Sequence, residues 1–210
     1  MLYTVVAIAR SGSSSLCKRV ALQYDAKNLG EVFFPFYGNN DPSVYVNKLL
    51  ELIEISKNKN IVVKILVNKS EQPRDIIKVL LESSAKIFYC LRLDHAAHCK
   101  SILGSIHTKK FGKRKPIDKL IHLDLNGDIV ESQGNRLIAY TKTQGQWFKE
   151  FPGELSILDE WGVEPYANWY EFDISKSTKE FLNPKIKPYL ERKFDVLSIF
   201  YQGDINSSLN

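Results

Sequence analysis

The chain has 210 residues, of which 44% are hydrophobic and 25% are charged, and its formal net charge at pH 7 is +5. This length and composition predict one compact domain with a buried core. The mild positive charge suits a small anionic ligand as well as it suits a nucleic acid, and we do not expect a nucleic-acid partner. The apolar run after Met1 is too short to span a bilayer and follows no basic segment. We therefore expect no membrane partner and a cytoplasmic protein, in a bacterial cell or in a host cell if the chain is viral.

Strands and helices are predicted to alternate in the first half of the chain. The apolar run 5–9 is typical of a strand buried on both faces of a parallel sheet, and it leads into a helix at 16–22. Asp41 and Pro42 begin a second helix. The further predicted elements are a short aromatic strand at 32–36, strands at 61–67 and 85–91, and helices at 42–56, 70–83 and 94–106. This alternation predicts an α/β fold with three layers, in which helices flank a mostly parallel central sheet.

The second half has a different pattern. Residues 109–116 form a basic loop, and Asn126–Gly127 predicts the turn of a hairpin over 123–130. The aromatic residues of 140–172 give no clear element, and the apolar run 194–201 predicts a last buried strand.

The Gly/Ser-rich segment after the first strand is typical of a phosphate-binding loop. Its residues are Arg10, Ser11, Gly12, Ser13, Ser14 and Ser15. In a strand–loop–helix unit the loop amides converge on one point, and the helix N-terminus adds partial positive charge. Gly12 allows close approach of an anion, and Arg10 offers a cation. The second Gly and the Lys-Ser/Thr pair of the ATPase pattern are absent. A serine-rich turn that only caps a helix has the same composition.

A second candidate anion site follows the strand 85–91. Arg92 lies at the carboxyl end of this strand, where α/β sheets bind ligands. Asp94 begins the next helix, and Ser101 lies two helical turns further on, on the same face. The alternatives are a surface ion pair for Arg92 and a solvated position for Ser101.

Together these two motifs resemble those of carbohydrate sulfotransferases, which use the donor 3′-phosphoadenylyl sulfate (PAPS). Arg10-Ser-Gly-Ser-Ser resembles their 5′-phosphosulfate loop, and the spacing from Arg92 to Ser101 resembles the 3′-phosphate motif of the trehalose 2-sulfotransferase branch. Leu16-Cys17, Leu29-Gly30-Glu31 with the following aromatic pair, and the segment 200–205 also resemble that branch.

The resemblance implies a P-loop NTPase-like sulfotransferase fold. It implies a single domain over 1–210, with a nucleotide-binding core at 1–106, a divergent acceptor or lid region at 107–190, and a last core strand at 194–201. It also implies transfer of a sulfuryl group from PAPS to a hydroxyl of a carbohydrate or small metabolite, leaving 3′-phosphoadenosine 5′-phosphate (PAP).

In that reaction Glu31 is the expected general base and Arg10 stabilises the leaving nucleotide. The loop residues 10–15 bind the 5′-phosphosulfate, Arg92 and Ser101 bind the 3′-phosphate, and no metal is needed. Two alternatives stay open: a nucleotide kinase with a degenerate phosphate loop, and a non-catalytic binding or structural protein of the same fold.

Overall fold

The computed structural model describes residues 1–33, 41–68, 74–108, 127–158 and 195–201. Its contacts divide the chain into two compact units. The first comprises Met1–Leu91 and Lys142–Ile157, and the second comprises Arg92–Thr141 and Leu158–Asn210. The expectation of a single domain over 1–210 stays a prediction.

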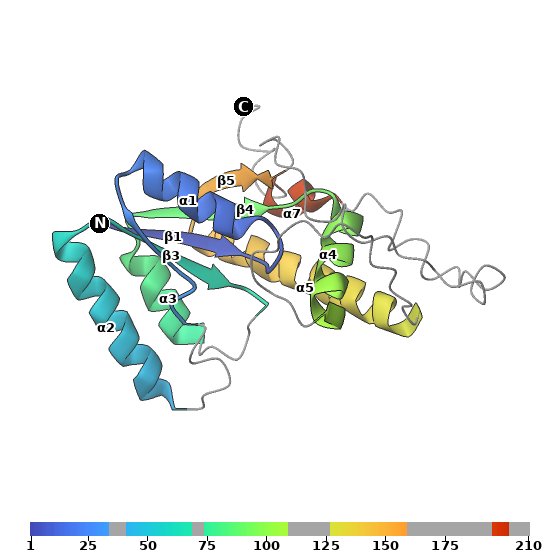
Figure 1. Ribbon diagram of the computed structural model, residues 1–210, viewed down its shortest axis with the longest axis horizontal. Coiled ribbons are helices and arrows are strands. Elements are labelled where there is room, and N and C mark those ends of the chain that lie inside the picture. Colours follow the sequence, from blue (N-terminus) through green and yellow to red (C-terminus); the bar gives the residue numbers. More distant parts are fainter. Residues whose placement is uncertain (34–40, 69–73, 109–126, 159–194, 202–210) are drawn as a thin grey trace, which may run out of the picture. The chain divides into compact units, whose positions relative to one another are not determined.

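The first unit is built on a five-stranded sheet with the order β2-β3-β1-β4-β5 (Figure 1). All of its strand pairs are parallel. The strands are β1 (Leu2–Ala7), β2 (Lys27–Gly30), β3 (Ile61–Leu66), β4 (Lys86–Leu91) and β5 (Glu154–Ile157). Every residue of β1 and β3 is buried, as continuous apolar runs predict for the central strands of a parallel sheet. The predicted α/β fold class is confirmed.

Helices cover both faces of this sheet. Helix α1 (Ser13–Gln23) packs against β1, β2 and β3. Helices α2 (Pro42–Asn58) and α3 (Arg74–Ser83) pack against each other and against β1. The crossovers β1–α1–β2 and β3–α3–β4 run in opposite directions along the sheet, and right-handed connections therefore place α1 and α3 on opposite faces. The predicted three-layer arrangement follows from this.

The last turns of α5 (Gly127–Glu150) belong to the first unit and stabilise its sheet. The buried amide of Gln144 donates to the backbone oxygens of Val6 (3.1 Å) and Cys90 (3.2 Å). These acceptors lie on the neighbouring strands β1 and β4, so one side chain joins the two strands that carry the candidate site.

The helix start at Asp41 is confirmed. Its carboxylate accepts from the Ser43 N–H at 2.9 Å, and Pro42 occupies the first helical position. The strands predicted at 61–67 and 85–91 are also confirmed, within one residue at their ends.

Three local predictions are wrong. Residues 127–130 begin helix α5 and are not half of a hairpin, because the chain continues with buried Gly134, Leu137, Thr141 and Gln144 at helical spacing. The last core strand predicted at 194–201 is a helix, α7 (Val196–Tyr201), in the described residues 195–201. Val196 and Phe200 are its buried residues and stand four positions apart. Val32 and Phe33 lie in a turn, and the strand of this region is β2.

The second unit contains α4 (His95–Thr108), the first part of α5, and α7. Asp94 begins α4 as predicted, since its carboxylate accepts from the Ala97 N–H at 2.8 Å. The basic segment 109–116 and most of the expected acceptor region 107–190 lie outside the described residues. Every helix in the described part of the chain is too short or too polar to cross a bilayer.

Candidate functional site

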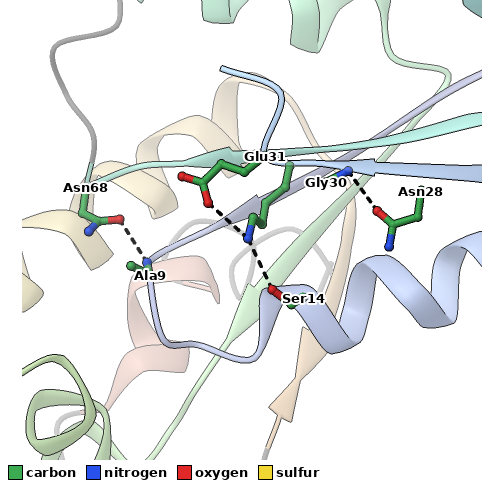
Figure 2. Close-up of polar contacts among 7 residues, drawn as sticks. Ala9, Ser14, Asn28, Gly30, Glu31 and Asn68 are labelled. Carbon is green, nitrogen blue, oxygen red and sulfur yellow. Dashed lines mark hydrogen bonds and ion pairs between the residues drawn. The ribbon is translucent and has the colours of Figure 1, made fainter. Parts of the chain in front are cut away.

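The loop after β1 has the backbone geometry of an anion-binding nest. Arg10 and Gly12 both have positive φ angles, 69° and 89°, and Ser11 between them does not. Such an alternation turns successive N–H groups toward one side of the chain. The loop is held through its own N–H groups: Ser11 N–H donates to the backbone oxygen of Ile8 at 3.2 Å, and Ala9 N–H donates to the side-chain Oδ1 of Asn68 at 3.0 Å (Figure 2).

Helix α1 begins inside this loop without a side-chain cap. Gly12 is the N-cap residue, and its oxygen accepts from the N–H groups of Ser15 (2.9 Å) and Leu16 (3.2 Å). Within residues 1–33 and the rest of the described chain, the N–H groups of Gly12, Ser13 and Ser14 have no hydrogen-bond acceptor. No serine caps the helix, so the alternative of a merely capping serine turn does not account for this loop.

The hydroxyl of Ser11 is the second feature that fits an anionic ligand. Ser11 is 1% exposed, and among the described residues its Oγ has no hydrogen-bond partner. A buried hydroxyl without a partner costs free energy unless a ligand or water satisfies it. Three open amides and this hydroxyl suit the oxygens of a phosphate or sulfate group.

A lysine that the sequence analysis did not single out lies beside the loop. Lys64 stands in the middle of β3, opposite Val5 of β1, and is 9% exposed. Its Nζ lies 3.4 Å from Ser14 Oγ and 3.3 Å from Glu31 Oε2 (Figure 2). The site therefore has a cation next to the loop, although the loop sequence contains no lysine.

Glu31 follows β2 directly, at the carboxyl end of that strand. The chain turns here at Gly30, which has a φ of 66° and donates its N–H to Asn28 Oδ1 at 2.9 Å. A left-handed backbone conformation at this position favours glycine over other residues. The Glu31 side chain is 21% exposed and the Lys64 side chain is 11% exposed, so their ion pair is largely shielded from water. The expected base thus lies next to the loop and pairs with Lys64.

Two buried thiols lie around the loop. The Cys90 thiol on β4 donates to Ser11 O at 3.1 Å, which ties the loop to a second strand. Burial raises the pKa of Cys17 and that of Cys90 to about 12, against weaker lowering effects that include the charge of Lys64. Both side chains therefore remain neutral thiols, and Cys17, Cys90 and Cys99 are all buried and free.

The second predicted motif belongs to the second unit. Arg92 follows β4 and is 3% exposed, and Ser101 lies on α4 and is 1% exposed. Both are buried, so neither is the solvated surface residue of the alternative interpretation. Burial lowers the pKa of His95 at the start of α4, with Asp94 acting in the opposite direction. The combination of Arg92 and Ser101 with the loop into one two-phosphate site stays a prediction.

The structure thus brings together the loop residues 10–15 and Glu31 of the predicted site, and it adds Lys64 and Asn68. A signal for Lys64 was present in the sequence: a single lysine within the apolar run 61–67 must find a partner if the strand is buried on both faces. Among the described residues, no group of three or more potential metal ligands comes together.

No protein-family model and no curated protein sequence matches the chain. Solved structures that are similar include shikimate kinase from Bacteroides thetaiotaomicron, with a TM-score of 0.47 and 10% identity over 76% of this chain and 86% of that one. The YorR protein from Bacillus subtilis, in complex with phosphorylated GDP, has a TM-score of 0.46 and 9% identity over 80% and 92% of the two chains. Similarity at this level says nothing of substrate or reaction.

Proposed function

We propose that the chain is a sulfotransferase that moves a sulfuryl group from PAPS to a hydroxyl of a carbohydrate or another small metabolite. The observation that carries the proposal is the loop after β1. Its three open amides, the buried Ser11 hydroxyl and the neighbouring Lys64 suit a tetrahedral anion, and a carboxylate lies next to them.

The residues of the loop would bind and orient the donor. The amides of Gly12, Ser13 and Ser14 and the Ser11 hydroxyl are hydrogen-bond donors for the oxygens of its 5′-phosphosulfate. Arg10 stabilises the negative charge that develops on the leaving oxygen. Arg92 and Ser101 would hold the 3′-phosphate and so set the register of the nucleotide.

Glu31 would act as the general base. The acceptor hydroxyl forms a new bond to sulfur, the bond from sulfur to the bridging oxygen of the donor breaks, and the proton of the hydroxyl passes to the Glu31 carboxylate. PAP leaves with the electron pair of the broken bond. Sulfuryl transfer makes the same demands as phosphoryl transfer, namely in-line positioning and stabilisation of charge.

A nucleotide kinase with a degenerate loop is the second candidate, and Lys64 is the observation that favours it. The ATPase pattern places a lysine against the β- and γ-phosphates, and Lys64 supplies an ammonium group beside the loop from β3 instead. The third alternative is a binding protein that retains the fold without catalysis.

Thermal unfolding with PAP, with ATP and Mg²⁺, and with buffer alone separates the three. A ligand at a hundred times its dissociation constant adds about 2.7 kcal/mol of stability, which corresponds to a rise in Tm of about 5 to 11 °C for a chain of this size. The sulfotransferase proposal predicts this rise in Tm with PAP. It also predicts that a sulfated acceptor forms when PAPS and a panel of sugars are supplied. A rise with ATP and Mg²⁺ alone favours the kinase and refutes the sulfotransferase.

Arginine variants give the matched control. Arg92→Ala is expected to abolish the response to PAP, because the 3′-phosphate loses its cation. Arg136→Ala removes an exposed arginine of α5 and is expected to leave the response unchanged. Glu31→Gln is expected to abolish turnover, and full turnover by this variant would show that Glu31 is not the base.

A further inference from the structure

The ion pair between Lys64 and Glu31 joins the two halves of the proposed chemistry. Lys64 Nζ contacts Glu31 Oε2 at 3.3 Å and Ser14 Oγ at 3.4 Å. Ser14 takes part in the site through two groups: its hydroxyl contacts Lys64, and its N–H is one of the three open amides. The ammonium group therefore lies one serine side chain away from the anion-binding nest.

The burial of Lys64 limits what its charge can do. Its side chain is 11% exposed, so water solvates the ammonium poorly and a carboxylate or another anion has to compensate it. In the protein without ligand that anion is Glu31. An anionic ligand in the nest brings a second negative charge to the same ammonium, and Glu31 then competes with the ligand for Lys64.

We propose that Lys64 is a donor-sensing positioning residue, which pairs with Glu31 in the free protein and transfers to the phosphosulfate of the bound donor. The inference rests on the proposed function. Glu31 is neutralised by Lys64 until the donor is bound, and it is released as a base only when the sulfuryl group is in place. The donor accordingly binds before the acceptor, and the base is not available to a hydroxyl in the absence of the donor.

The competition predicts opposite effects of two charge-removing substitutions on PAP affinity, measured by isothermal titration calorimetry. Lys64→Met removes the cation and is expected to weaken PAP binding at least tenfold, the size of a charge-assisted hydrogen bond. Glu31→Gln removes the competitor and is expected to tighten PAP binding about threefold to tenfold. The double variant is expected to bind PAP as weakly as Lys64→Met, because Glu31 acts only through Lys64.

Two further variants separate this role from a structural one. Lys64→Arg keeps the charge and is expected to restore most of the affinity that Lys64→Met loses. Glu54→Gln breaks a shorter ion pair, 2.6 Å, between Glu54 and Lys57 on the exposed surface of α2. It is expected to leave PAP affinity within twofold of the unmodified protein, and a greater change overturns the assignment of the effect to Lys64.

The outcomes distinguish a failure of the proposed role of Lys64 from a failure of the proposed sulfotransferase function. If the unmodified protein does not bind PAP, the sulfotransferase proposal fails and the inference fails with it. If the unmodified protein binds PAP and Glu31→Gln binds it equally or more weakly, only the donor-sensing role of Lys64 is overturned.

Discussion

The ion pair at the loop makes a prediction about stability that needs no ligand. Glu31→Gln replaces the carboxylate with an amide of the same shape. Lys64 is 9% exposed, and its ammonium then keeps its contact with the Ser14 hydroxyl but loses the negative charge beside it. Lys64→Met removes the buried charge and keeps most of the side-chain volume. Each variant removes one partner of the pair, but the ammonium that Glu31→Gln leaves behind is more deeply buried than the carboxylate that Lys64→Met leaves behind, and an uncompensated buried charge is costly. We therefore expect Glu31→Gln to be the less stable of the two.

The magnitude follows from the geometry. Two charges 3.3 Å apart attract with about 5 kcal/mol at an effective dielectric constant of about 20. Hydration of Glu31, whose side chain is 21% exposed, offsets part of this, and a net loss of about 2 kcal/mol is expected for Glu31→Gln. This corresponds to a fall in Tm of about 4 to 8 °C. Lys64→Met is expected to stay within about 1 kcal/mol of the unmodified protein, because water hydrates the remaining Glu31 carboxylate, which is 21% exposed.

Differential scanning calorimetry and urea unfolding of the unmodified chain, the two single variants and the double variant measure this cycle. The double variant is expected to match Lys64→Met, since an amide at position 31 has no charge to compensate once the ammonium is gone. If Glu31→Gln is as stable as the unmodified protein while Lys64→Met is markedly less stable, the reasoning from a buried and dependent ammonium is refuted.

Three further predictions concern other parts of the fold. Because Arg10 has a φ of 69°, Arg10→Gly is expected to be about 1 kcal/mol more stable than Arg10→Ala in urea unfolding, and equal stabilities contradict the left-handed conformation. Burial lowers the pKa of His95 below 6.5. As the pH falls, this histidine therefore takes up a proton in the unfolded chain before it does so in the folded chain, and the free energy of unfolding decreases below about pH 6.5. His95→Asn is expected to lose less stability between about pH 7.5 and about pH 5 than the unmodified protein, and identical losses contradict this. A Cβ at Gly153 would lie 2.4 Å from Ile87 O, and Gly153→Ala is therefore expected to lower the free energy of unfolding by about 1 to 3 kcal/mol, whereas an unchanged Tm contradicts the close approach.

The parallel sheet could be predicted from the sequence because its central strands are continuous apolar runs separated by helices with clear starts, such as Asp41–Pro42. The two helices read as strands failed for a different reason. At Asn126–Gly127 a strong local turn signal competes with the helical spacing of buried residues that begins only at Gly134. At 196–201 a short apolar run has no periodicity long enough to decide between strand and helix.

Of the candidate site, the loop and Glu31 could be predicted because they are continuous segments of sequence with a recognisable composition. Lys64 could not be placed in the same way. Its contact with Ser14 joins residues 50 positions apart, and only the register of β3 against β1 brings them together. Asn68, which holds Ala9 from the end of β3, was missed for the same reason.

Because Lys64 on β3 supplies an ammonium group beside Ser14, the loop sequence needs no lysine of its own. The loop therefore consists of glycine, serine and arginine, and the ammonium beside Ser14 comes from another strand. A search pattern written as one continuous motif therefore discards chains of this kind at the first step. A pattern with two parts, a Gly/Ser-rich turn after the central strand and a lone lysine inside the apolar strand that pairs with it, would retain them. A substitution at position 64 is then expected to change this site as much as a substitution in the loop.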